Sequence, residues 1–213
     1  MTRPARPSVA DRSGRAYGSL ALLTDSERRG LRPIGASVRE VADRTAMLFD
    51  TVMKKSRNVR LFRAVCADGR DALRIPHVIC AGRRVILVDS VTWPPGAYTV
   101  AESGHVHCDG QYIGQSVAPL ACAVAGWREM LPDGHLVTGL VVVHPNGEGG
   151  IGLYGDLPSE VGWSLAHDAV HDVCRLLPPD SQRTSSVALA RLRDASGSPT
   201  TEVPAGSNGR IHG

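Results

Sequence analysis

Two pairs of histidines have a spacing that could bind a metal ion. His167 and His171 are four residues apart, as in the HExxH zinc motif, with Asp168 in place of its glutamate. His105 and His107 alternate along an expected strand and would share one of its faces. Neither pair is accompanied by further ligands in the sequence, so we interpret both as exposed polar side chains.

A glycine-rich run, GEGGIG at 147–152, resembles a phosphate-binding loop because it follows an expected strand. It lacks the lysine of the GxxxxGK[ST] motif and no helix starts directly after it, which favours a turn. The sequence also lacks a Gly-x-Ser-x-Gly elbow, the nucleophile motif of α/β-hydrolases. Chemistry that needs lysine has few residues to use, because all basic residues except Lys54 and Lys55 are arginine.

The composition is typical of a folded intracellular protein with a mild basic bias. The 213 residues suffice for one domain with tails, and 42% of them are hydrophobic, enough for a buried core. A net charge of +3 does not by itself indicate a nucleic-acid-binding protein. Five widely spaced cysteines suggest no disulfide framework. With no apolar run near the roughly 20 residues of a membrane helix and no signal peptide, we predict a cytoplasmic protein that has no membrane partner.

Hydrophobic periodicity and turn residues predict an α/β protein with a mixed central sheet flanked by helices. Ser37 followed by Glu40 is a capping-box pattern that starts the first helix. The continuous apolar run VILVD indicates a strand buried on both faces. We expect helices at 36–53, 114–131, 158–177 and 184–194, and strands at 60–66, 72–80, 85–89, 97–101, 105–108, 136–144 and 151–155.

Residues 1–34 are expected to form a basic, flexible N-terminal arm, with one short element near Ser19–Leu23. This stretch is rich in proline, glycine and serine, which bury too little apolar surface to form a packed core. Its seven arginines could contact nucleic-acid phosphates in a salt-dependent way. They are Arg3, Arg6, Arg12, Arg15, Arg28, Arg29 and Arg32. The main domain is then 35–178, and 179–213 forms a short helix and a disordered tail.

The segment IPHVICAGRRVILVDSVTW at 75–93 resembles the signature of the nuclease-related domain, a branch of the PD-(D/E)xK endonucleases. The family pattern is Ile-Asp-His on one strand, a glycine turn, an apolar strand, an acidic residue, a spacer, a lysine and a later tryptophan. The matching positions are Ile75, His77, Ala81, Gly82, Val85–Val88, Asp89 and Trp93. Further similarity at 96–100 and 109–112 extends the resemblance over about 35–178 and implies a restriction-endonuclease-like core.

In that family, carboxylates on adjacent strands hold Mg²⁺, which polarises the scissile phosphate and activates a water molecule. A lysine two residues after the second carboxylate stabilises the developing charge, and a helix glutamate often completes the site. The resemblance places Asp89 at the second acidic position and Glu40 at the helix glutamate. It also places Pro76 at the first aspartate and Val91 at the lysine, where neither side chain can perform the role.

These departures lead to the hypothesis of a catalytically inactive nuclease-related protein that binds nucleic acid and needs no cofactor. Asp89 and Glu40 would be remnants of the metal site. One alternative is an active Mg²⁺-dependent DNA endonuclease with a rearranged site, in which His77 supplies a ligand although it should face the other side of its strand. A second alternative is a protein-interaction scaffold, since a fold does not fix a function.

Overall fold

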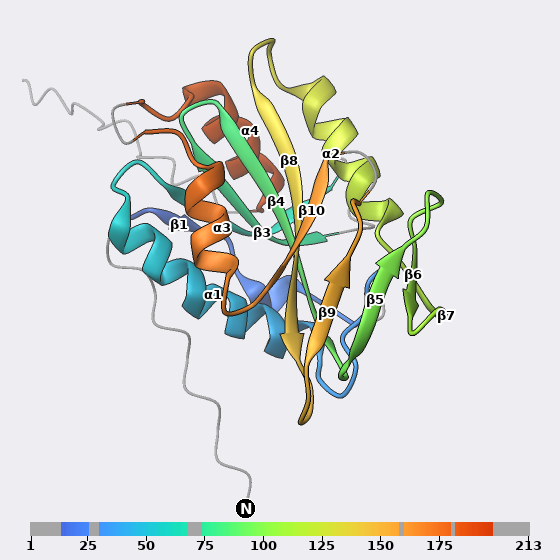
Figure 1. Cartoon of the computed structure of the whole chain (residues 1–213). Coiled ribbons are helices and arrows are strands. Elements are labelled where there is room, and N and C mark those ends of the chain that lie inside the picture. The colour runs from blue at the N-terminus through green and yellow to red at the C-terminus, as the bar shows by residue number, and fades with distance from the viewer. Residues whose placement is uncertain (1–13, 26–29, 68–73, 158–159, 180–181, 198–213) are drawn as a thin grey trace, which may run out of the picture.

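The architecture was analysed in a computed structural model, which describes residues 14–25, 30–67, 74–157, 160–179 and 182–197 (Figure 1). It is a mixed α/β fold with two sheets and flanking helices, as the sequence predicts. Within the described residues, no helix is long and apolar enough to cross a membrane.

The larger sheet has six strands in the order β1-β2-β3-β4-β8-β10. β2 and β3, and β3 and β4, are antiparallel hairpin neighbours, whereas β4, β8 and β10 run parallel. The strands are β1 (Ala16–Tyr17), β2 (Arg60–Cys66), β3 (Arg74–Ala81), β4 (Arg84–Trp93), β8 (Leu136–Pro145) and β10 (Val161–Leu165).

The smaller sheet has the order β7-β6-β5-β9 and lies beyond the carboxyl ends of β4 and β8 (Figure 1). Its place follows from the chain path, because β5 (Gly96–Val100) comes directly after β4 and β9 (Ile151–Tyr154) follows β8. β6 (His105–Cys108) and β7 (Gln111–Ser116) form a hairpin whose turn contains Asp109 and Gly110.

Helices cover both faces of the large sheet. α1 (Val38–Lys55) and α3 (Ala169–Leu176) pack on one face, where Phe49 and Val173 join a cluster with Ile86. α2 (Ala118–Met130) and α4 (Ser186–Ala195) pack on the other face, in the larger cluster that contains Leu87 and Trp127. Because side chains alternate along a strand, β4 supplies even-numbered residues to the α1 face and odd-numbered residues to the α2 face.

The predicted start of the first helix is confirmed, because the Ser37 hydroxyl accepts a hydrogen bond from the Glu40 backbone N–H at 3.2 Å. The predicted helix over 158–177 is wrong in its first half. Residues 161–165 form β10 in parallel register with β8, which buries Val161, and helix α3 begins only at Ala169.

The expectation of a flexible arm over 1–34 is corrected for residues 14–25 and 30–34. β1 pairs with β2, a short 3-10 helix, η1, spans Leu20–Leu22, and Leu20, Leu23 and Leu31 are buried. Burial of these three leucines stabilises a segment whose overall composition is polar. Arg3, Arg6, Arg12, Arg28 and Arg29 lie outside the described residues, as does most of the predicted C-terminal tail.

Candidate functional site

Pro76 and Asp89 lie on neighbouring antiparallel strands. His77 of β3 pairs with Val88 of β4, so continuing that register by one residue brings Pro76 opposite Asp89. Both residues are buried. This is the relation that the nuclease-related signature requires between its two acidic positions, but here one of them is an imino acid with no oxygen in its side chain.

Asp89 is a buried carboxylate in the middle of β4. Its carboxylate accepts a hydrogen bond from the Ser90 backbone N–H at 2.7 Å, and only 7% of the residue is exposed. Leu87 and Val91, two residues to either side, belong to the core cluster on the α2 face. Strand alternation therefore directs Asp89 and Val91 to the same face, as the signature expects of its acid and lysine.

Glu40 lies in the first turn of α1, exposed, where its carboxylate forms an ion pair with Arg44 at 2.9 Å. α1 covers the sheet face opposite to the one that Asp89 shares with Leu87 and Val91. The structure thus places the two expected remnant carboxylates on different faces. No group of three or more His, Cys, Asp or Glu side chains that could hold a metal ion occurs in the described part of the chain. Mg²⁺ needs several oxygen ligands, which these residues do not provide together.

A buried polar network on the α1 face has no counterpart in the sequence-based prediction. The Thr45 hydroxyl oxygen lies 2.9 Å from the Ser90 hydroxyl and 2.8 Å from His144 Nε2. Burial, with a smaller contribution from Arg44, lowers the pKa of His144 to about 4, so the imidazole is neutral at neutral pH. All three residues are at most 8% exposed, so their polar groups satisfy one another inside the fold. The sequence signal for this network is Thr45, a polar residue at a position where the periodicity of α1 calls for an apolar one.

His77 belongs to this same α1 face. Its ring packs edge-on against Phe49 of α1 with the ring centres 5.5 Å apart. It therefore faces away from the side of the sheet that Asp89 shares with Leu87, as strand alternation predicts.

The two exposed histidine pairs make local contacts. His167 precedes α3 and lies 3.2 Å from the Asp168 carboxylate, while His171, inside α3, lies 3.6 Å from Asp172. His105 and His107 flank the ring of Tyr112, with centroids 4.9 and 5.9 Å from it. The interpretation of exposed polar side chains describes His105, His167 and His171, whereas His107 is half-buried.

A cluster of cations, here called the basic end, surrounds the N-terminal ends of β2 and β4. The C-terminus of α1 leads into β2 there, the Ser185 N–H donates to the Gly82 carbonyl, and the Thr184 hydroxyl donates to the Asn58 carbonyl. These contacts gather three chain segments and the end of α3 around the β3–β4 turn. The basic end consists of Lys54, Lys55, Arg57, Arg60, Arg83, Arg84, Arg175 and Arg183.

The charges of the basic end are accessible. Arg60 and Arg84 are half-buried and the other six side chains are exposed. None of those six forms an ion pair within the part of the chain that the structure describes. Lys54, Lys55 and Arg175 also stabilise the helix ends in whose last turns they lie. Asp133, in the turn before β8, offsets part of the charge.

The opposite end of the molecule has the opposite sign. Residues 94–117 and 145–157, which build the small sheet, contain no lysine or arginine, but they carry four exposed carboxylates. These are Glu102, Asp109, Glu148 and Asp156. The net charge of the chain is modest, but positive charge lies at the start of β4 and β8 and negative charge at the small sheet that follows them.

Of the expected arm, Arg15 is engaged inside the fold. Its guanidinium donates to the carbonyls of Met53 and Ser56, both at 2.9 Å, and so caps the C-terminus of α1. Arg15 is thus a structural residue rather than a free phosphate contact.

Searches with models of protein families, against curated proteins and against solved structures found no match for this chain.

Proposed function

We propose that this protein binds nucleic acid through the phosphate backbone and does not cleave it, as a degenerate relative of the nuclease-related domain. The observation that carries the proposal is the basic end, where eight cations from four segments converge. The six exposed ones form no ion pair with any other described residue. Such a surface neutralises phosphates and releases condensed counterions, which gives affinity without sequence preference. The arginines of residues 1–13 would add to it.

The absence of cleavage is inferred from the positions that the resemblance makes catalytic. Pro76 removes a metal ligand and Val91 removes the ammonium group, leaving Asp89 among apolar side chains. Loss of one electrostatic group of this kind lowers a rate by about 10²–10³-fold. Losing a ligand and the lysine together leaves no means of activating water.

Fluorescence anisotropy with a labelled DNA duplex, over a salt series with and without Mg²⁺, tests both parts. We expect binding that weakens steeply with salt, no dependence on Mg²⁺ and an intact duplex after prolonged incubation. Mg²⁺-dependent cleavage that Asp89→Ala abolishes would instead establish an active nuclease. No binding at low salt would contradict the proposal and leave the scaffold alternative.

A further inference from the structure

A cavity of about 330 Å³ lies between α2, α4 and the adjoining ends of β2 and β3. It lies at the other end of β2 from the basic end and shares no residue with it. Its floor is apolar, formed by Trp127, Met130, Ala195 and the Cys66 side chain. Arg74, Arg191 and Asp194 line its margins, so its formal charge is positive.

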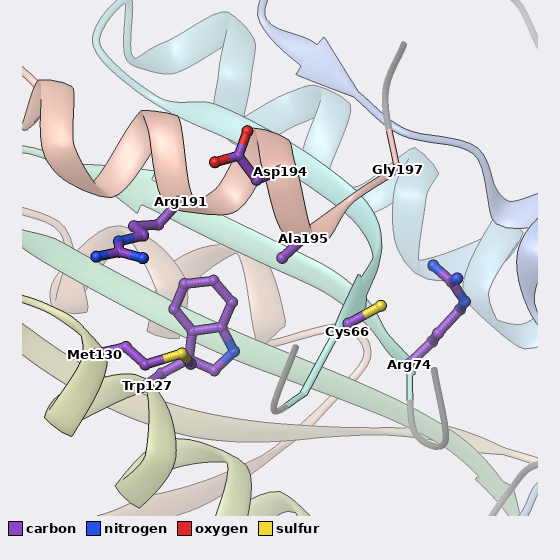
Figure 2. A pocket seen from close by; sticks show the side chains of 8 residues that line it. All are labelled: Cys66, Arg74, Trp127, Met130, Arg191, Asp194, Ala195 and Gly197. Carbon is purple, nitrogen blue, oxygen red and sulfur yellow. The ribbon is translucent and has the colours of Figure 1, made fainter. Parts of the chain in front are cut away.

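The indole of Trp127 carries a polar group that the fold leaves unused. The residue is 1% exposed, and its Nε1–H has no hydrogen-bond partner among the residues that the structure describes. Figure 2 shows this nitrogen turned toward the space between Trp127 and Cys66, under Ala195. A buried donor without an acceptor is costly, and an acceptor that enters the cavity would remove that cost.

The two arginines stand on opposite sides of this apolar floor. In Figure 2 the Arg191 side chain extends on the side of Met130 and the Arg74 side chain on the side of Cys66. The Asp194 carboxylate is turned away from the indole. Arg74 Nη1 donates to the Ala64 carbonyl at 3.0 Å, so this guanidinium is engaged by the fold. Arg191 forms no hydrogen bond or ion pair within the described residues.

From this arrangement we infer that the cavity binds a small organic anion with a flat ring. The ring lies on the apolar floor, a ring acceptor receives the Trp127 N–H, and the anionic group pairs with the Arg191 guanidinium. A nucleoside monophosphate and a carboxylate on a nitrogen-containing aromatic ring share this chemistry. The volume admits a ligand of that size and excludes a duplex.

Isothermal titration calorimetry of the full chain with adenosine monophosphate, nicotinate and inorganic phosphate, each to about 5 mM, tests the inference. We expect saturable binding of at least one ring-bearing anion, and the preferred one identifies the source of the ligand. Inorganic phosphate should bind more weakly, because it makes no contact with the apolar floor. Equal binding of all three, or of none, would overturn the inference.

Two variants locate the binding. Trp127→Phe keeps an aromatic ring but removes the donor, and should weaken binding about three- to tenfold. Arg191→Gln is an exposed change that should weaken it about tenfold or more. Arg193→Gln, on the same helix but outside the lining, should leave it unchanged, and the melting temperature of each variant reports its folding. Unaltered affinity in both Trp127→Phe and Arg191→Gln would contradict the site. The variants spare the basic end, so DNA binding succeeds or fails independently.

Discussion

Alternation along β4 assigns each of its polar residues to one of two environments. Asp89 shares the α2 face with apolar neighbours, whereas Ser90 turns to the α1 face and joins Thr45 and His144. The carboxylate that the resemblance makes catalytic is therefore separated by the sheet from the polar network. On the neighbouring strand β3, the residue opposite Asp89 is Pro76, which has no oxygen in its side chain.

Replacing Pro76 by aspartate tests whether this position and Asp89 form a vacant metal site. Two buried carboxylates would repel each other, and we expect Pro76→Asp to lower the free energy of unfolding by about 2–4 kcal/mol without Mg²⁺. If the two share a pocket, millimolar Mg²⁺ should raise the melting temperature of this variant and not that of the wild type. Pro76→Asn, which removes the ring without adding charge, is the control. A Pro76→Asp variant that melts identically with and without Mg²⁺ would show that the signature is misaligned.

The buried His144 makes stability depend on pH. The folded protein holds the imidazole neutral with its pKa lowered to about 4, while the unfolded chain has the ordinary histidine pKa of 6.5. Below about pH 6.5 the unfolded state binds the proton first, so stability falls as the pH falls toward 4. We expect a loss of about 1–2 kcal/mol between pH 7 and 4.5, allowing for partial screening by solvent. Urea unfolding should show this loss in the wild type and a smaller one in His144→Gln. Parallel pH profiles for the two proteins would exclude His144 as the cause.

At the scale of elements, local patterns were sufficient where one segment decides its own structure. The helix that begins after Ser37 and the strand containing VILVD were predictable, because a cap and a continuous apolar run are local signals. β10 was not, because GWSL also fits the apolar periodicity of a helix, and parallel pairing with β8 decides between the two. β1 was missed for the same reason, since its two residues form a strand only beside β2. Single residues of the candidate site, such as Asp89, could be predicted from the sequence. The grouping of the basic end could not, because it depends on how the fold brings four separate segments together.

Close contact between α2, β8 and β10 depends on one glycine. A Cβ atom at Gly139 would lie 2.9 Å from Val161 Cγ2 and 3.2 Å from Val124 Cγ2. Gly139→Ala should therefore cost about 1–3 kcal/mol through overpacking. Gly162→Ala, in the adjacent strand with no atom within 4 Å of its Cβ, is the matched control and should change stability by less than about 0.5 kcal/mol. Chemical denaturation of both variants measures the difference, and equal stabilities would contradict the packing role of Gly139.

At the scale of the whole molecule, the separation of charge follows from the topology. β4 begins at the β3–β4 turn, which carries Arg83 and Arg84, and β8 begins beside this turn. Both strands lead into the small sheet, which carries the exposed carboxylates. A net charge of +3 conveys none of this, because it sums the two ends. For the proposed binding to a polyanion, we expect the basic end to approach the phosphates and the small sheet to face away from them.

The location of the charge, rather than its amount, should decide DNA binding. The triple variant Arg57→Gln, Arg83→Gln, Arg183→Gln removes three exposed cations of the basic end. A second triple variant, Arg39→Gln, Arg44→Gln, Arg193→Gln, has the same net charge but loses cations elsewhere.

In the first triple variant, the slope of log K against log salt should fall by about 2–3, because each lost phosphate contact removes about 0.9. In the second it should stay within about one contact of the wild type. Anisotropy titrations of both proteins over the same salt series supply the slopes. Equal losses would mean that DNA responds only to overall charge, and the basic end would then have no specific role. If the first variant still binds DNA with an unchanged slope, the basic end is not the DNA contact. The contact would then be made by the arginines of residues 1–13, which neither variant changes.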